Sequence, residues 1–300
     1  MRQLIILGNG FDLFFDLKTK YKDFFNYLNA NYPEEKAYID DFALWDNIED
    51  SSLWMDFESN LGNINLFVLD DFRYDIEELK NLYCELENVK DLLKTMFVSW
   101  VKSINCDIDK QKYKKYCFNN DAFLLTFNYT LTVEKHFKIN PLNIYHIHGS
   151  IDDEIVFGHA SNKSINNKID EYRELFTEES LEEFPPLYED SLHVANDFIY
   201  ALEKPTKKII KKLNKVLEVR EINLHDIEEV IIIGHSYSEV DFPYFQLIAK
   251  KCKKANWFFG VHSTEDEKKA QQYIMKLNIP HYQVVNSDTL IEKTMKNNDI

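Results

Sequence analysis

Short apolar runs recur along the chain, and most of them end at a glycine or a small polar residue. Within these runs apolar residues follow one another without polar alternation, which is typical of strands in a parallel sheet that is covered on both faces. Glycine and small polar residues at the ends of such runs favour strands over segments of buried helix. The predicted strands cover residues 3–7, 122–127, 143–147, 154–157, 229–233, 256–259 and 283–285.

Segments with a helical repeat of apolar residues separate these strands. Apolar residues recur close to helical spacing from Phe11 to Leu28, which predicts a strand–turn–helix unit at the start of the chain. The longest helical pattern runs from about residue 70 to 104. Strands that alternate with helices indicate an α/β fold with a parallel sheet. Further helices are expected at about 130–137, from 240, from 264 and after 286.

The distribution of these elements predicts one α/β domain over residues 1–300. Its sheet core is expected in residues 1–30, 119–160 and 221–300, with two charged helical insertions at 31–118 and 161–220. The hydrophobic content of 45%, with 22 Phe and 17 Tyr, is enough to fill a large core. This composition excludes an intrinsically disordered chain.

The formal charge of −16 argues against broad, nonspecific binding of nucleic acid, although it allows a local basic patch. Lysines between Lys204 and Lys215 fall around apolar residues at helical spacing. We interpret this segment as an amphipathic helix with a solvated basic face, in preference to a phosphate- or nucleic-acid-binding patch.

Cysteine usage and hydropathy predict a cytoplasmic protein. The four cysteines show no C-x-x-C spacing, as expected for reduced thiols. No apolar run reaches 18 residues, and the first twelve residues do not resemble a signal peptide. We therefore expect no membrane segment.

The residues that follow the predicted strands are glycine, small polar residues or histidine. Ligands of open parallel sheets bind outside the carboxyl ends of the strands, so these residues are expected to share one surface. Five of the nine histidines lie at or beside these positions. The segments are 8–12, 128–130, 148–150, 158–159, 234–236 and 261–263.

Gly8 and Gly10 open the first helix directly after a strand. Such a turn allows close approach of a ligand, and free helix amides favour a phosphate. The third glycine of a G-x-G-x-x-G fingerprint is missing. Asp12 in the first turn would compete with a phosphate, and its simplest interpretation is a helix cap.

Two strand-end residues are candidates for catalysis. His148 beside Gly149 has the chemistry of a general base near neutral pH, or it is a hydrogen-bonded packing histidine. Asn128 is suited to hold a ribose hydroxyl or to position a water molecule, or it forms an Asx turn.

Two other classes of site remain open. His146 and His148 would lie on one face of a strand, where His159 or His235 would complete a metal site, but no acid or cysteine stands at a usual zinc spacing. The segment 234–238 resembles a nucleophile elbow around Ser236. Asp266 and His281 follow in the order of a serine hydrolase, although the last glycine of that motif is replaced by Ser238.

As an ordered set, these motifs resemble the AbiH family of bacteriophage abortive-infection proteins. The matching stretches are LIILGNGFDLFFDLKTKYKDF, LLTFNYT, IYHIHGSIDDEIVFG and IIIGHSYSEVDFPYF, and LWMDFESNL with Trp54 and Glu58 is also similar. The resemblance spans most of the chain and implies a role in antiviral defence.

The set is similar, more distantly, to SIR2-like NAD-binding proteins, which implies a Rossmann-like parallel sheet with helical insertions. By position, Gly8 and Gly10 would form the phosphate turn, Asn128 would contact the nicotinamide ribose or activate water, and His148 would be the base. Asn9, Asp12 and Thr130 depart from that pattern. Without a four-cysteine zinc module, deacetylation is not expected, and another nucleotide or nucleoside remains an alternative ligand.

The resemblance therefore predicts an antiphage effector that hydrolyses NAD at its N-glycosidic bond. The alternatives are a nucleotide-binding sensor or partner module without turnover, and a serine or metal-dependent hydrolase. We expect a phage-derived trigger or a partner defence protein, and possible self-association. Expected catalytic residues are His148 and Asn128; expected nucleotide-binding residues are Gly8, Asn9, Gly10, Phe11, Asp12, Gly149, Gly234, His235, Ser236, Asp241, His262 and Ser263.

Overall fold

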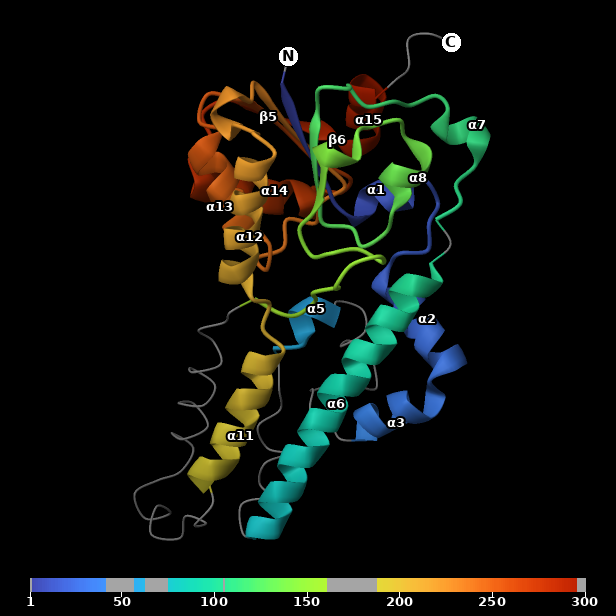
Figure 1. The fold of residues 1–300 in the computed structure, drawn as a ribbon, viewed down its shortest axis with the longest axis vertical. Coiled ribbons are helices and arrows are strands. Elements are labelled where there is room, and N and C mark those ends of the chain that lie inside the picture. Colours follow the sequence, from blue (N-terminus) through green and yellow to red (C-terminus); the bar gives the residue numbers. More distant parts are fainter. Residues whose placement is uncertain (1, 42–56, 63–74, 105, 161–187, 296–300) are drawn as a thin grey trace. The chain divides into compact units, whose positions relative to one another are not determined.

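The computed structural model describes the chain apart from residues 1, 42–56, 63–74, 105, 161–187 and 296–300 (Figure 1). The chain forms two compact units. The first, the sheet unit, comprises residues 1–20, 101–156 and 205–300. The second, the helical unit, comprises residues 21–100 and 157–204.

The sheet unit is built on six parallel strands in the order β3-β2-β1-β4-β5-β6. This arrangement confirms the predicted α/β fold with a Rossmann-like sheet. The strand order reverses between β1 and β4, which defines the topological switch point where doubly wound proteins bind ligands. The strands are β1 (Gln3–Leu7), β2 (Phe123–Thr126), β3 (Ile144–His146), β4 (Glu229–Ile233), β5 (Asn256–Val261) and β6 (Tyr282–Asn286).

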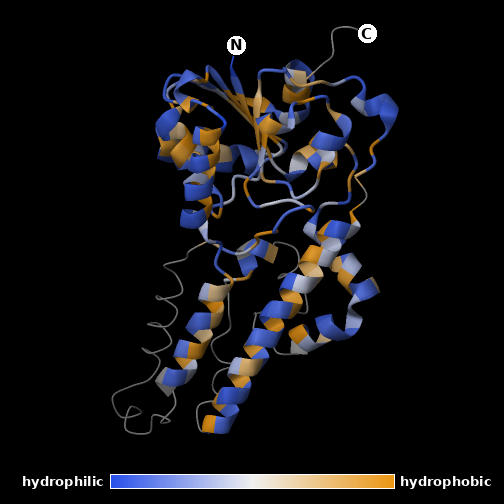
Figure 2. Ribbon diagram, viewed as in Figure 1, coloured by the Kyte–Doolittle hydropathy of each residue, from blue (hydrophilic) through white to orange (hydrophobic). Residues whose placement is uncertain are grey.

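Hydrophobic cores cover both faces of this sheet. Leu4 and Ile6 of β1 belong to one core, while Ile5 and Leu7 belong to the other. Because both faces are buried there, the neighbouring strands β1, β2 and β4 are apolar along most of their length (Figure 2), whereas the edge strand β6 is largely exposed. The unit's helices are α1 (Asn9–Phe14), α7 (Lys110–Tyr113), α8 (Thr132–His136), η3 (Pro141–Asn143), α12 (Thr206–Val219), η4 (Leu224–Asp226), α13 (Phe242–Lys251), α14 (Thr264–Leu277) and α15 (Ser287–Met295).

The helical unit has an aromatic core of its own. Phe57 and Phe97 stack with ring centroids 5.6 Å apart, and Phe97 and Phe157 lie 4.7 Å apart. Apolar and polar residues alternate along its longest helix, as expected for a helix with one buried face (Figure 2). Its helices are α2 (Tyr21–Asn31), α3 (Pro33–Asp41), α5 (Phe57–Asn60), α6 (Ile76–Ser103) and α11 (Tyr188–Ala201).

A buried ion pair lies within the helical unit. Lys204 Nζ is 2.9 Å from Glu58 Oε1, and the lysine side chain is fully buried. The Tyr21 hydroxyl donates to Glu58 Oε2 at 3.1 Å. These contacts give Glu58 a role inside this unit, whereas Trp54 lies outside the described residues.

Two predicted elements are wrong. Residues 154–157 do not form a strand; the Val156 amide instead donates to the His148 carbonyl and closes a loop of nine residues. The helix expected from Phe11 to Leu28 ends at Phe14, because Asp16 adopts a left-handed conformation with φ of 64° before α2 begins at Tyr21. Asp tolerates that conformation, and the spacing of apolar residues does not reveal it.

Candidate functional site

Three glycines hold the loop after β1 against the loop after β4, at the topological switch point between these strands. The Gly8 amide donates to Ile233 O at 2.9 Å, and the Gly10 amide donates to Gly234 O at 2.8 Å. Gly234 has φ of 65°, and a Cβ added there would lie 2.3 Å from the Phe11 nitrogen. Only glycine permits this conformation and this close backbone contact together.

This contact gives the turn at Gly8 and Gly10 a role other than the expected binding of a phosphate. The amides of Gly8 and Gly10 are used between the loops, and the Phe11 amide donates to Gly8 O at 2.9 Å. An added Cβ on Gly8 or Gly10 would meet the backbone of Gly234 at 2.6 Å. The turn therefore shapes the switch point, and these three amides are not available to a phosphate.

Asp12 is buried at the start of α1, where only 1% of its surface is exposed. The Thr130 hydroxyl donates to Asp12 Oδ2 at 2.6 Å, and the Thr132 hydroxyl donates to Thr130 at 3.1 Å. Burial raises the pKa of Asp12 to about 6, although Thr130, Thr132 and Asn128 oppose that rise. α1 has no side-chain cap, so Asp12 does not act as the expected helix cap.

Asn128 follows β2 beside this carboxyl group and is 8% exposed. Its amide donates to Thr126 Oγ1 at 3.1 Å, and its carbonyl oxygen accepts from His146 Nδ1 at 2.8 Å. These two bonds fix the backbone of Asn128. Asp12, Asn128 and Thr130 therefore form one buried polar cluster across the ends of β1 and β2.

His146 lies at the end of β3, where it holds the backbone carbonyl of Asn128. The charge on its ring is paired with a carboxylate. His146 Nε2 donates to Glu134 Oε1 at 2.7 Å. Burial alone lowers the pKa of His146, but the hydrogen bond and charge of Glu134 and the Asn128 carbonyl outweigh it and raise that pKa. Both ring nitrogens face acceptors, which the imidazolium satisfies by donating from each.

Asp241 lies between two buried histidines at the ends of β3 and β4. Its Oδ1 is 3.6 Å from His148 Nε2, and its Oδ2 is 3.2 Å from His235 Nε2. The side chains of His148 and His235 are 3% and 2% exposed, compared with 13% for Asp241. We call these three residues the His–Asp–His cluster.

The hydrogen bonds of His235 define its tautomer. Its Nδ1 accepts from the Tyr237 amide at 2.9 Å, so this nitrogen carries no proton. The proton therefore lies on Nε2, which donates to Asp241. A neutral His235 thus orients the Asp241 carboxylate, and that carboxylate can stabilise a proton on His148.

Aromatic rings enclose the His–Asp–His cluster. The Phe127 ring meets His148 at 5.4 Å and His235 at 4.7 Å, both edge to face. Tyr244 lies 5.5 Å from His148, and Phe245 lies 4.9 Å from His235. Such rings exclude water and strengthen the interaction between Asp241 and the histidines.

The turn after His148 depends on Gly149. This glycine has φ of 79°, and a Cβ there would lie 1.9 Å from Glu154 O. The same turn receives the bond from Val156 to the His148 carbonyl at 2.8 Å. Gly149 therefore sets the backbone that carries His148.

Asn9, Phe11 and Ser236 lie apart from these two clusters. Phe11 is fully buried among phenylalanine rings, and the exposed Asn9 side chain donates to Thr19 O at 2.8 Å. Ser236 is exposed, and the next helix begins only at Phe242. Asp266 is bound to the cap of α14, so the described residues lack the geometry of a nucleophile elbow and its partners.

His262 and Ser263 follow β5 as expected. Ser263 caps α14 by accepting from the Asp266 amide at 3.0 Å. The exposed His262 has Nδ1 3.8 Å from Asp288 Oδ1. A helix cap accounts for Ser263 without a ligand.

His159 belongs to the helical unit, where its ring contacts the carbonyls of Ala160 and Ile199 at 2.6 and 3.0 Å. A Cβ on Gly62 would lie 3.0 Å from this ring, which accounts for the glycine at position 62. Across the described part of the chain, no three His, Cys, Asp or Glu side chains are arranged to hold a metal ion.

Thr132 and Glu134 were not predicted as site residues. Both lie in the short helix that follows the β2 end, two and four residues beyond Thr130. Their proximity to that strand end is the only sequence signal, since their partners Thr130 and His146 are set by the turn and by β3.

The fold and the two clusters define a doubly wound α/β protein with buried ionisable groups at its switch point. The family model for bacteriophage abortive infection AbiH matches residues 4–261. The chain therefore belongs to the AbiH family, and the family supports a role in phage abortive infection. No curated protein shows significant similarity to the chain. Among the helices in the described ranges, none is long and apolar enough to cross a membrane.

Proposed function

We propose that the chain acts in abortive infection by hydrolysing the N-glycosidic bond of NAD. The supporting observation is the His–Asp–His cluster, which places an acid–base pair at the carboxyl edge of a sheet with Rossmann order. Doubly wound sheets bind nucleotides at this edge. Loss of NAD in an infected cell would stop host metabolism before phage release.

In the proposed reaction, the bond between the ribose C1′ and the nicotinamide nitrogen breaks. Nicotinamide leaves with the bonding electron pair, which neutralises its ring charge. A water oxygen then bonds to C1′ and its proton passes to His148, where Asp241 stabilises the imidazolium. Asn128, held by His146, positions that water or the ribose hydroxyl.

The proposal gives the glycine turn a shaping role. Gly8, Gly10 and Gly234 hold the two loops in contact, and the engaged amides of Gly8 and Gly10 do not provide a phosphate cradle. We assign nucleotide contact instead to the strand-end residues beside the two clusters.

The test is release of nicotinamide from NAD by the purified full chain, followed by chromatography. We expect His148→Ala and Asp241→Asn to lose at least about a hundredfold in rate, as for loss of a general base. The matched control is His225→Ala, an exposed histidine just before β4, which should retain the wild-type rate. Equal nicotinamide release by wild type and His148→Ala would overturn the catalytic role.

A nucleotide-binding module without turnover is the second candidate. The burial of His148 and Asp12, at 3% and 1% exposure, favours it because buried groups meet water less readily. Mass spectrometry of nucleotide released on denaturation separates the two: bound nucleotide with no product over time supports the module. Product formation that requires His148 supports the hydrolase.

A further inference from the structure

Two neighbouring elements of the sheet unit carry nine lysines. Five lie on α12, and four lie at the end of α13 or directly after it. All are exposed except the partly exposed Lys251. We call this set the lysine face: Lys207, Lys208, Lys211, Lys212, Lys215, Lys250, Lys251, Lys253 and Lys254.

The two groups of lysines adjoin one another. Lys251 Nζ donates to Asn214 Oδ1 of α12 at 2.7 Å, which joins the two helices at their polar edges. Glu218 is the one acidic residue in either helix. Among the described residues, none of the nine lysines forms an ion pair with a carboxylate.

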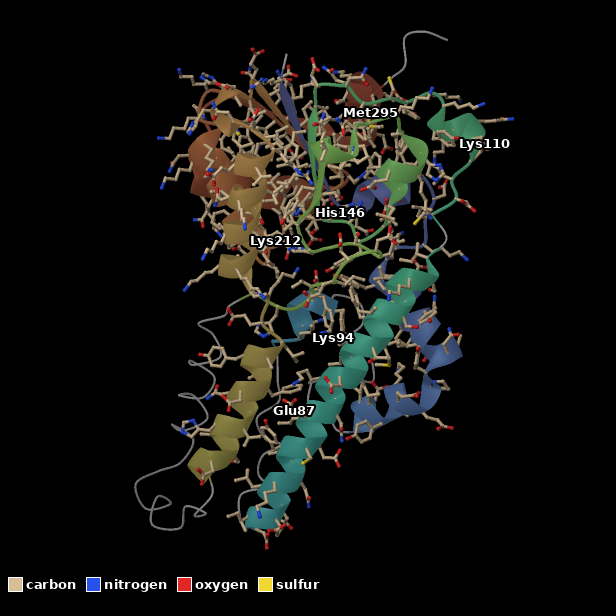
Figure 3. All side chains as sticks on the ribbon, in the orientation of Figure 1. Glu87, Lys94, Lys110, His146, Lys212 and Met295 are labelled. Atoms are coloured by element: carbon tan, nitrogen blue, oxygen red, sulfur yellow. The ribbon has the colours of Figure 1, made fainter. Side chains whose placement is uncertain are left out.

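This concentration of charge is unusual in a chain with a net charge of −16. On α12 the apolar residues Ile209, Leu213 and Leu217 are buried in the core, so the lysines occupy the solvent side (Figure 3 labels Lys212). A solvated face needs some charges for solubility, but it does not require nine cations on or directly after two helices that together contain one acidic residue. Unbalanced charge of this density favours a polyanionic partner.

A cavity of about 490 Å³ lies at the α13 end of the lysine face. Lys250 and Lys253 line it together with Trp257, Lys276 and Asn278. Lys276 is paired with Glu239 at 2.6 Å, whereas the other two lysines add positive charge at the cavity wall. The cavity therefore offers a recess for a phosphate beside the flat part of the lysine face.

We propose that the lysine face binds the phosphate backbone of a nucleic acid. Lysines on successive turns of α12 and at the end of α13 supply several separate phosphate contacts, as sequence-independent binding requires. An anionic membrane is the less favoured partner, because interfacial helices insert an apolar face and the apolar face of α12, with Ile209, Leu213 and Leu217, is buried in the core. The overall negative charge then limits binding to this one face.

The test measures fluorescence anisotropy of labelled single-stranded RNA, single-stranded DNA and duplex DNA with the purified full chain. The variant Lys207→Gln, Lys211→Gln, Lys215→Gln removes three cations and keeps helix-forming side chains. A matched control replaces three exposed lysines elsewhere in the sheet unit: Lys110→Gln, Lys114→Gln, Lys115→Gln. A thermal melt checks that both variants fold like wild type.

We expect the lysine-face variant to lose at least about tenfold in affinity. For this variant the slope of log K against log salt concentration should be smaller in magnitude by roughly two to three. Each phosphate that a lysine neutralises contributes about 0.9 to the magnitude of that slope. The control should keep the wild-type affinity. Equal affinity of both variants, or no binding to any of the three probes at 50 mM salt, overturns the proposal. Binding to phosphatidylserine vesicles without binding to nucleic acid assigns the face to a membrane instead.

Discussion

Single residues at the carboxyl edge of the sheet show how burial sets proton affinity. Asp12 follows β1 and His146 ends β3, with β2 between these strands, and their surroundings favour the neutral form of Asp12 but the charged form of His146. Among the described residues no cation pairs with Asp12, and burial raises the pKa of its carboxyl group, whereas Glu134 pairs with His146 and raises the pKa of that ring. The two predictions at this scale follow from these opposite environments.

Asp12→Asn is expected to stabilise the protein at neutral pH. A pKa raised to about 6 means that folding favours the neutral carboxyl group, so stability falls as pH rises from about 4 through 6. That loss amounts to about 3 kcal/mol for a shift of two units. Asparagine still accepts from Thr130 but does not ionise. Urea unfolding at pH 4.5 and 7.5 should show a gain only at the higher pH; an equal loss at both would contradict this account.

Glu134→Gln should lower the pKa of His146, because it removes the charge that outweighs burial. A histidine whose pKa is higher in the folded state than in the unfolded state stabilises the folded protein. That stabilisation is fully present at pH values below about 6.5 and is lost as the pH rises through the folded-state pKa. The variant should therefore lose more stability at pH 5.5 than at pH 8.5. NMR titration of the His146 ring checks the direction, with His225 as the exposed reference. An unchanged His146 titration would show that Glu134 is not the cause.

At the scale of elements, the contact between the β1 and β4 loops decides the shape of the switch point. Gly8 and Gly10 meet Gly234 backbone to backbone, so each loop depends on small residues in the other. From the sequence alone, the same glycines are expected to leave space for a ligand. The structure shows that the space is filled by protein.

Gly234→Ala is expected to destabilise the sheet unit by about 2–4 kcal/mol, since it adds both left-handed strain and a backbone clash. Chemical denaturation measures the loss. Asn278→Gly serves as the control, because that residue has φ of 51° at the end of α14 and glycine suits it well. Wild-type stability of Gly234→Ala would mean that the loops separate freely in solution.

At the scale of the whole molecule, charge is distributed unevenly. The chain has 51 acidic and 35 basic residues, while the lysine face gathers nine of its cations. The excess of acids elsewhere causes self-repulsion, which salt screens. The same salt competes with any polyanion bound to the lysine face.

Raising NaCl from 50 to 500 mM should therefore raise the melting temperature by a few degrees, or about 2–4 °C for each kcal/mol of relieved repulsion. Differential scanning fluorimetry measures this shift in the free protein. The lysine-face variant, which is more negative, should gain more than wild type. A melting temperature that falls with salt would indicate that attractive pairs dominate.

Much of the fold follows from local pattern. β4 was predicted at its observed bounds, and β1 likewise, because strands buried on both faces form continuous apolar runs, here four residues long after a polar first residue. His148, Asn128 and Asp12 were predicted as site residues from their places after strands, because the carboxyl ends of parallel strands meet at one edge of the sheet. Residues 154–157 were wrongly predicted as a strand, because a short run of apolar residues such as 155–157 looks the same in a strand and in a partly buried loop.

The pattern of residues along the chain is enough to predict the alternation of buried strands and helices, and with it the edge where the polar residues gather. That Asp241 lies between His148 and His235, and that Gly234 packs on Gly8, follows from the folded arrangement alone. Strand order sets such neighbours, and β1 pairs with β4 across more than 200 residues of chain. Local periodicity reports which face a residue turns toward, whereas the choice of partner depends on how distant segments pack.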